Sequence, residues 1–258
     1  MTDLRVALIQ TELEWEDTAA NRQHFDQLID AIAQPTDLII LPEMFTTGFT
    51  MQPDAVAESM QGDTIEWMRA TAAKTNAVIT GSIVVVEREL FYNRLVWMRP
   101  DGSYATYDKR HLFALAGEHQ HYKQGTTRLV TELKGWKICP LICYDLRFPV
   151  WSRNTVAYDL LLYVANWPDR RRDAWKSLLV ARAIENQCYT IGVNRVGQDA
   201  NGHLYAGDST VVDYAGCLLA SQSYTAGILQ LKLNAQQQHD FRTKLDFLAD
   251  RDAFSVIP

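Results

Sequence analysis

Cysteine, basic charge and long apolar runs are all scarce in this sequence. Four cysteines among 258 residues are too few for a disulfide framework. The formal net charge is -6 and there is no long Lys/Arg run, which argues against binding to nucleic acid or anionic membranes. Every apolar run is shorter than the roughly 20 residues that span a bilayer, and residues 1–5 do not begin a signal peptide. We therefore expect a cytoplasmic protein with reduced thiols and neither a nucleic-acid nor a membrane partner.

No Gly/Ser-rich linker, charge block or internal repeat divides the sequence, so we expect a single domain over residues 1–258. Strand-like and helix-like segments alternate from the N-terminus. The expected order is a strand at 5–10, a helix at 18–34 that Pro35 ends, a strand at 37–43, a helix at 64–76 and a strand at 77–83. This order is typical of an α/β fold.

Many more strands follow in the second half of the chain. We expect strands at 91–99, 103–108, 127–133, 136–143, 159–166, 188–194, 208–213, 217–221 and 226–232, helices at 149–157 and 172–186, and a polar loop at 111–124. So many strands favour two packed sheets with helices outside. The polar stretch from about Leu233 is expected to form an arm that packs on the body or on a second subunit.

Four polar residues stand at the ends of expected strands: Glu43, Lys109, Cys143 and Asn166. Ligands collect at the carboxyl ends of parallel strands, so these groups are expected to share one pocket. A thiol between a strand and a helix can be held as a thiolate nucleophile, a carboxylate can act as general base, and a lysine can stabilise an oxyanion. Each also has a simpler interpretation, namely a buried structural cysteine, a strand-end carboxylate or a solvated basic turn.

The combined pattern resembles the nitrilase (carbon–nitrogen hydrolase) superfamily, from about residue 4 to the C-terminus. That family has a Glu after a strand, a Lys after a hairpin and a Cys at a strand end. The matching segments are Leu41-Pro42-Glu43, Tyr107-Asp108-Lys109-Arg110-His111-Leu112 and Leu141-Ile142-Cys143-Tyr144-Asp145-Leu146-Arg147-Phe148-Pro149, with Gly117-Glu118, Asn166-Trp167-Pro168 and residues 181–187 in support.

The resemblance implies a four-layer α-β-β-α sandwich, a homodimer or larger oligomer, and an active site without cofactor or metal. It also implies roles. Glu43 takes the thiol proton and later activates water, while Cys143 attacks the carbonyl and forms a thioester. Lys109 and the backbone N–H of Tyr144 hold the oxyanion, and Glu118 positions Lys109 and the substrate.

The chain looks most like the ω-amidase branch, which deamidates short dicarboxylic monoamides such as 2-oxoglutaramate, 2-oxosuccinamate and succinamate. Residues 165–172 fit a substrate with a free carboxylate, because arginine recognises carboxylates bidentately. We therefore expect substrate contacts from Asn166, Trp167, Arg170 and Arg171. Solvated arginines at a helix start, and a tryptophan used only for packing, remain alternatives.

Other functions also fit parts of the sequence. Within the superfamily, a nitrilase or an amidase of different specificity uses the same triad, and a glutaminase would supply ammonia to a partner synthetase. His111, Glu118, His119 and His121 invite a metal site, but their spacing is poor for zinc. A thiol sensor built on Cys139 and Cys143 is disfavoured, since strand residues four apart lie about 13 Å from each other.

Overall fold

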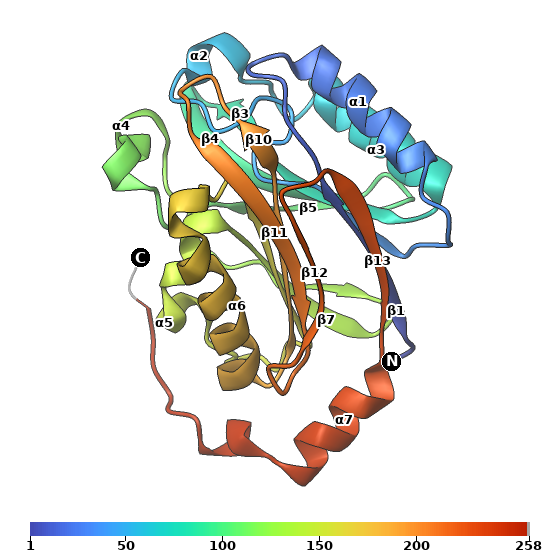
Figure 1. Ribbon diagram of the computed structural model, residues 1–258. Helices are drawn as coiled ribbons and strands as arrows, with labels where there is room; N and C mark the ends of the chain where they lie inside the picture. Colours follow the sequence, from blue (N-terminus) through green and yellow to red (C-terminus); the bar gives the residue numbers. More distant parts are fainter. Residues whose placement is uncertain (257–258) are drawn as a thin grey trace.

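Two β-sheets face each other at the centre of the computed structural model, which describes residues 1–256 (Figure 1). The first sheet has the strand order β13 (Gly227–Leu233), β1 (Leu4–Gln10), β2 (Leu38–Ile40), β3 (Val78–Glu87), β4 (Leu90–Met98) and β5 (Tyr104–Asp108). Strands β1, β2 and β3 are parallel, whereas the outer pairs are antiparallel. The carboxyl ends of β2 and β3 therefore point to the same edge.

The second sheet has seven strands in a related arrangement. Its order is β10 (Val196–Gln198), β11 (Leu204–Val212), β9 (Tyr189–Asn194), β8 (Leu160–Ala165), β7 (Trp136–Ile142) and β6 (Thr131–Leu133), with β12 (Leu218–Ser223) paired to β11. Strands β7, β8 and β9 are parallel at its centre. Their carboxyl ends thus form a second row of strand ends.

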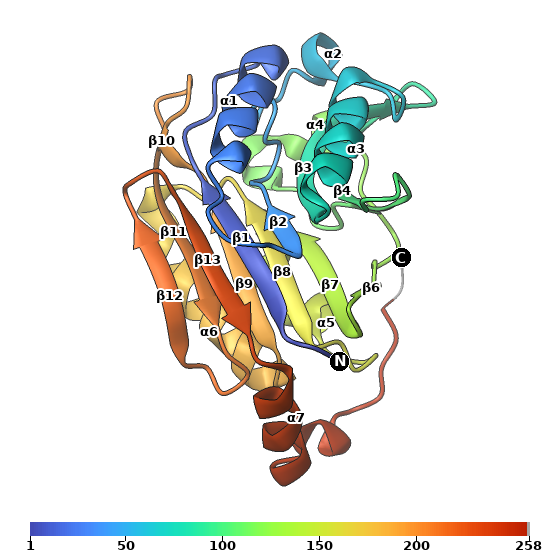
Figure 2. The same cartoon turned by 90° about the vertical axis from the view of Figure 1, so that its right-hand side faces the viewer.

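Helices cover the outer face of each sheet (Figures 1 and 2). Helices α1 (Thr18–Asp30) and α3 (Asp63–Thr75) pack on the first sheet through a cluster that includes Phe25 and Met68. Helix α6 (Arg172–Asn186) packs on the second sheet through Trp175 and Leu179, beside the short helix α5 (Pro149–Ser152). The predicted four-layer α-β-β-α sandwich is therefore confirmed.

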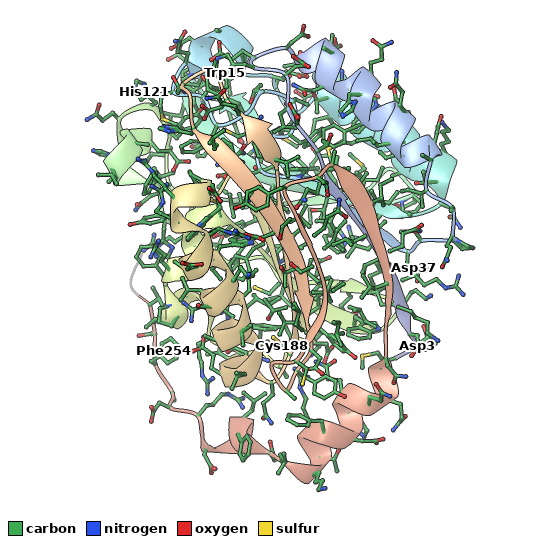
Figure 3. The ribbon with its side chains drawn as sticks, viewed as in Figure 1. Asp3, Trp15, Asp37, His121, Cys188 and Phe254 are labelled. Carbon is green, nitrogen blue, oxygen red and sulfur yellow. The ribbon has the colours of Figure 1, made fainter. Side chains whose placement is uncertain are left out.

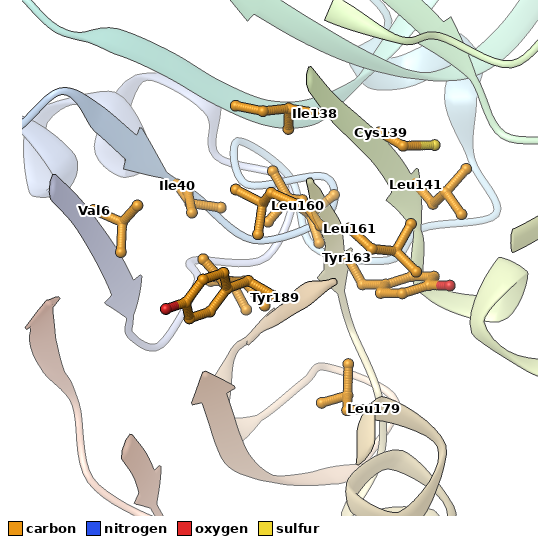
Figure 4. Packing of buried hydrophobic residues seen from close by; sticks show 14 of the residues in the cluster. Val6, Ile40, Ile138, Cys139, Leu141, Leu160, Leu161, Tyr163, Leu179 and Tyr189 are labelled. Atoms are coloured by element: carbon orange, nitrogen blue, oxygen red, sulfur yellow. The ribbon is translucent and has the colours of Figure 1, made fainter. Parts of the chain in front are cut away.

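A continuous apolar core explains why these segments form strands. Strand β8 is buried at all six positions, as expected for a parallel strand covered on both faces. Val6 and Ile40 of the first sheet share one cluster with Ile138 and Leu160 of the second, and Figure 4 shows them together. This packing fixes the distance between the two rows of strand ends.

The expected helix at 149–157 is wrong, because α5 ends at Ser152. The side chain of Asn154 accepts from the backbone N–H of Tyr158 at 2.9 Å and donates to the Tyr158 carbonyl at 2.9 Å. Local side-chain bonds of this kind compete with helical ones. The helix expected to run to residue 34 likewise ends at Asp30.

The C-terminal segment packs on the body of its own chain. Asn234 caps helix α7 (Ala235–Lys244) by accepting from Gln237 N at 2.8 Å, and the 3₁₀ turn η4 (Phe247–Asp250) follows. Arg242 anchors α7 through Asp159 Oδ1 at 2.7 Å and the carbonyl of Tyr158 at 2.7 Å. Among residues 1–256, no helix has both the length and the apolar character needed to cross a membrane.

Candidate active site

The two sheets bring three of the predicted residues to one place. Glu43 follows β2, Cys143 follows β7 directly, and Asn166 follows β8 directly. The link across the sheets is direct, because the backbone N–H of Asn166 donates to Glu43 Oε2 at 2.8 Å. The Asn166 side-chain amide also donates to the Glu43 carbonyl at 2.5 Å. Asn166 thus fixes Glu43 and is not only a residue of the pocket wall.

Glu43 is fully buried and accepts hydrogen bonds on both carboxylate oxygens. Oε1 accepts from Lys109 Nζ at 2.8 Å and from Asn93 Nδ2 at 2.8 Å, while Oε2 accepts from Asn166. These three donors come from three different segments of the chain. The carboxylate is therefore held in a fixed orientation beside the thiol.

Lys109 follows β5, and its ammonium group lies between two carboxylates. Nζ is 2.8 Å from Glu43 Oε1 and 2.9 Å from Glu118 Oε2. Burial alone lowers the pKa of Lys109, but the negative charges of Glu118 and Glu43 outweigh it, so the pKa is raised. Lys109 is thus a permanent cation at neutral pH.

Glu118 is buried rather than a surface-loop carboxylate. It starts the short helix α4 (Glu118–His121), and its Oε2 accepts from the backbone N–H of Phe113 at 2.5 Å. Burial raises the pKa of Glu118, Lys109 opposes this, and the charge of Glu43 adds to the rise. Glu118 therefore ties the Phe113 segment to Lys109.

Cys143 opens the 3₁₀ turn η2 (Cys143–Arg147) and keeps 8% of its surface exposed. Its backbone φ is 41°, in the left-handed region that L-residues rarely adopt. Burial and the neighbouring charge of Glu43 raise the pKa of the Cys143 thiol well above its usual range, although Lys109 acts in the opposite direction. The resting thiol is therefore protonated at neutral pH.

A cavity of about 360 Å³ opens over Cys143 and Lys109. Its walls combine aromatic and apolar groups with a few polar ones, as in typical small-molecule sites. The lining residues are Phe49, Met51, Phe113, Leu115, Ala116, Tyr144, Arg147, Asn166, Trp167, Pro168, Arg170, Arg171, Asp199, Asn201, His203 and Tyr205. All four residues expected to touch substrate thus line the cavity, together with Tyr144.

Comparison with known proteins agrees with this geometry. The profile of the carbon–nitrogen hydrolase family matches residues 5–242. The chain belongs to the carbon–nitrogen hydrolase family. The omega-amidase YafV of Yersinia enterocolitica is 46% identical, with full coverage of both chains. A 2-oxoglutaramate amidase of Bacillus subtilis is 32% identical over 95% of this chain and 96% of its own.

A solved structure of the same superfamily is also very similar. The carbon–nitrogen hydrolase superfamily protein of Xanthomonas campestris, which carries an arsenic adduct in its active site, superposes with a TM-score of 0.97. It is 44% identical, and the match covers 99% of this chain and 100% of that one. The carbon–nitrogen hydrolase fold of this chain is thus the nitrilase-type sandwich that the sequence predicted.

Three arginines of this carbon–nitrogen hydrolase, Arg147, Arg170 and Arg171, place positive charge in the cavity wall. Arg147 stacks over Trp167 at 4.9 Å, and Arg171 stacks over Phe113 at 4.9 Å. The pKa of Arg171 is lowered, first by burial and then by the charges of Arg170 and Arg147. Within residues 1–256, no carboxylate forms an ion pair with any of these three. The cavity wall thus carries three guanidinium groups together with one carboxylate, that of Asp199.

Trp167 combines packing with a place in the wall. Its indole Nε1 donates to the carbonyl of Arg171 at 2.8 Å, and its ring packs against Trp175 at 5.5 Å. It is nearly buried. Trp167 thus supports the turn η3 (Asp169–Arg171), which carries Arg170 and Arg171.

The structure also describes the residues of the two alternative sites considered from the sequence, a metal site and a thiol sensor. No group of three or more His, Cys, Asp or Glu residues among positions 1–256 is arranged to hold a metal. His121 lies at the outer edge of the molecule on α4 (Figure 3), and Cys188 is buried far from it. Burial raises the pKa of Cys139 to about 12, and Cys139 forms no disulfide with Cys143.

Sequence reasoning missed several residues of the site. Arg147 lies within the quoted cysteine motif, so its position beside Cys143 was a usable signal. Asn93, whose side-chain amide donates to Glu43 Oε1, was given no role. The hairpin of β10 and β11 supplies Asp199 and Tyr205 to the cavity, joined by a hydrogen bond of 2.8 Å. Nothing local in that segment points to the pocket.

Proposed function

We propose that this protein is an ω-amidase, which hydrolyses the terminal amide of short dicarboxylic monoamides to the acid and ammonia. One observation carries the proposal: Cys143, Glu43 and Lys109 meet beneath a cavity whose wall holds arginines without carboxylate partners. The first feature suits attack on an amide carbonyl, and the second suits a substrate whose far end is anionic. The names of the two curated relatives support the same activity.

In the acylation step, Glu43 takes the thiol proton while Cys143 Sγ attacks the amide carbon. The carbonyl electron pair moves to oxygen and gives a tetrahedral oxyanion. When this collapses, the C–N bond breaks, Glu43 returns its proton to the leaving nitrogen, and ammonia departs from a thioester. Concerted proton removal suits this site because the pKa of the Cys143 thiol is raised by burial and by Glu43.

In the deacylation step, Glu43 acts as base a second time. It takes a proton from water as the water oxygen attacks the thioester carbon. Collapse of the second tetrahedral intermediate breaks the C–S bond, and the sulfur of Cys143 regains a proton from Glu43. The carboxylic acid then leaves, and the site returns to its starting state without any cofactor.

Lys109 and the backbone N–H of Tyr144 are proposed to hold the oxyanion. The ammonium group of Lys109 has three protons, and the carboxylates of Glu43 and Glu118 accept from it. Because Lys109 also lines the cavity, one of its protons is proposed to reach the substrate oxygen. Donors placed in advance where negative charge develops are worth roughly 10²–10³ in rate.

The free carboxylate of the substrate is proposed to bind Arg171 and Arg170, with Arg147 as a third cation. The stacking of Arg171 on Phe113 and of Arg147 on Trp167 holds these two guanidinium groups while leaving N–H groups for the ligand. Such charge-assisted bonds contribute about 1.5–3 kcal/mol each. A neutral amide of the same length is therefore expected to bind much more weakly.

The decisive test measures ammonia release from 2-oxoglutaramate, 2-oxosuccinamate, succinamate, glutamine, butyramide and a short nitrile. We expect fast turnover of the carboxylate-bearing monoamides, slow turnover of butyramide and no turnover by Cys143→Ala. Preference for the nitrile would instead assign a nitrilase. Ammonia release from glutamine only in the presence of a synthetase would assign a glutaminase subunit.

We also propose that the protein is a homodimer that pairs through helices α5 and α6, which cover the second sheet, and through the C-terminal segment beside them. Val150, Ile184, Phe247 and Phe254 are exposed apolar residues, and Val150 and Phe254 line one surface hollow. Burying them against a second copy would remove this apolar surface from water. Light scattering should give twice the chain mass, and Ile184→Asp should give the monomer mass.

A cytoplasmic location is part of the same proposal. All four cysteines are free thiols, and the proposed nucleophile must stay reduced to act. Cell fractionation with an antibody to the protein would test this, and recovery from an oxidising compartment would contradict it.

A further inference from the structure

The backbone at the nucleophile is strained. Cys143 has a φ of 41°, and a left-handed conformation costs an L-residue roughly 1–2 kcal/mol. It lies between the last residue of β7 and the 3₁₀ turn η2. Such a conformation persists only where the surrounding contacts determine it. The groups that hold this turn therefore decide where the sulfur points.

The carboxylate of Asp145 is the centre of those contacts. It is fully buried and accepts four hydrogen bonds. Oδ2 accepts from Ile142 N at 3.0 Å and from Tyr107 OH at 2.7 Å. Oδ1 accepts from the backbone N–H of His111 at 3.0 Å and from His111 Nδ1 at 2.8 Å. One carboxylate thus accepts from all four of these donor groups.

The donors come from both halves of the catalytic machinery. Ile142 directly precedes the nucleophile Cys143. Tyr107 and His111 stand two residues before and two residues after Lys109. The buried carboxylate of Asp145 therefore binds the end of β7, which precedes the thiol of Cys143. It also binds residues on both sides of Lys109.

Aromatic packing makes this connection rigid. The His111 ring stacks on Phe148 with a centroid distance of 3.6 Å and an angle of 4°. Tyr107 OH accepts from Trp151 Nε1 at 2.9 Å while it donates to Asp145. Because aromatic side chains hold Tyr107 and His111 in place, a movement of the Asp145 carboxylate would shift the segment around Lys109 as well as the end of β7.

We propose that Asp145 is a positioning residue, whose carboxylate sets the alignment of Lys109 Nζ with Cys143 Sγ without touching the substrate. The proposal deepens the amidase function and rests on it for its effect on turnover. The negative charge and two-sided acceptor geometry are both required. Asparagine at this position would turn an NH₂ group toward one of the two donor pairs, and that pair would separate.

The test compares Asp145→Asn with the parent protein in a Cys217→Ser background, since Cys217 is the exposed cysteine. Three quantities are measured: kcat and KM for succinamate, the rate of Cys143 alkylation by iodoacetamide against pH, and the melting temperature. We expect kcat to fall about 100-fold, as for misplacement by roughly 1 Å, with KM changed less than about threefold. The alkylation midpoint should move to higher pH, because a displaced Lys109 lowers the thiol pKa less.

Asp159→Asn is the matched control. Asp159 is also a largely buried carboxylate that accepts from a backbone N–H and a charged side chain, Lys137 N at 2.9 Å and Arg242 Nη1 at 2.7 Å. It lies at the start of β8, at the opposite end from Asn166. We expect this variant to lose thermal stability while kcat per folded molecule and the alkylation profile stay at parent values.

Asp145→Asn with parent kcat and a parent alkylation profile would overturn the proposal, whatever its melting temperature. If Asp145→Asn does not fold, Tyr107→Phe removes one donor and should give a smaller change in the same direction. No shift in Tyr107→Phe would then count against the proposal. The alkylation measurement needs no amide substrate, so it decides the role of Asp145 even if succinamate and 2-oxoglutaramate are not hydrolysed.

Discussion

Arg172 and Asp208 form a bidentate ion pair, in which Arg172 Nε and Nη2 each lie 2.9 Å from a carboxylate oxygen of Asp208. Arg172 Nη1 also donates to Tyr224 OH at 2.6 Å. Of the three consecutive arginines, this one is therefore directed at β11, while Arg170 and Arg171 line the cavity. The pair attaches the turn η3 to the second sheet and so fixes its neighbours in place.

Asp208→Asn should weaken binding of substrates that carry a carboxylate. Loss of the bidentate pair frees η3, so that Arg170 and Arg171 are no longer held in advance, and we expect KM for succinamate to rise about tenfold, equivalent to about 1.4 kcal/mol. The KM for butyramide, which has no carboxylate, should stay the same. Steady-state kinetics on both substrates measure the difference, and an equal rise for both would mean general damage to the cavity.

Arg171→Met should show whether this guanidinium binds the substrate directly. We expect KM for succinamate to rise about 10–100-fold, from loss of a charge-assisted bond of about 1.5–3 kcal/mol. Methionine keeps contact with Phe113, and the repulsion that lowers the Arg171 pKa is relieved. The melting temperature should therefore not fall. A variant that is less stable but keeps its KM would assign Arg171 a structural role instead.

Glu43→Gln should separate thiol acidity from catalysis. The groups that act on the Cys143 thiol include Glu43, Lys109 and Arg171, and the charge of Glu43 raises the thiol pKa whereas Lys109 lowers it. A neutral glutamine removes the repulsion, so the pKa falls and the midpoint of iodoacetamide alkylation moves to lower pH. Amide hydrolysis should nevertheless drop at least about 10²-fold, because the general base is lost.

Alkylation rates and succinamate turnover are measured on the same preparation of Glu43→Gln. A midpoint that moves to higher pH would show that Glu43 promotes ionisation of the resting thiol, contrary to this view. Glu43→Asp serves as the control, since it keeps the charge and should leave the midpoint near the parent value.

The sequence predicted a shared pocket because Glu43, Lys109 and Cys143 follow strands, and strand ends are recognisable from hydrophobic runs. The proposed roles of the three residues came from the resemblance to the nitrilase superfamily, since each strand-end position alone also fits a structural residue. The ends of helices were less certain, since the Asn154 side chain stops α5 by bonds that no periodicity reveals.

The rest of the cavity wall could not be predicted from the sequence, because tertiary contacts bring its residues together. Tyr205 and Asp199 reach it from the hairpin of β10 and β11, in a stretch where the sequence predicted no strand. The roles of Arg171 and Arg172 differ only because Asp208, 36 residues away from Arg172, binds one of them. Spacing along the chain cannot distinguish two adjacent arginines, whereas a partner from another strand does.

Glu118→Gln should change the pH dependence of turnover in a defined direction. Glu118 and Glu43 together raise the pKa of Lys109, and the oxyanion role proposed for Lys109 requires it to be protonated. Removing one negative charge lowers that pKa, so activity should be lost at lower pH on the alkaline side. Glutamine can still accept from Phe113 N, which keeps the cavity wall in place.

The measurement for Glu118→Gln is kcat for succinamate between about pH 6 and 11, with kcat at neutral pH expected to fall roughly 10–100-fold. Glu66→Gln, on the exposed face of α3, is the control and should leave the whole profile unchanged. An alkaline limb that stays in place would mean that the charge of Glu118 does not act through Lys109. A fall in kcat alone would then assign Glu118 to holding the Phe113 segment, because that is its other contact.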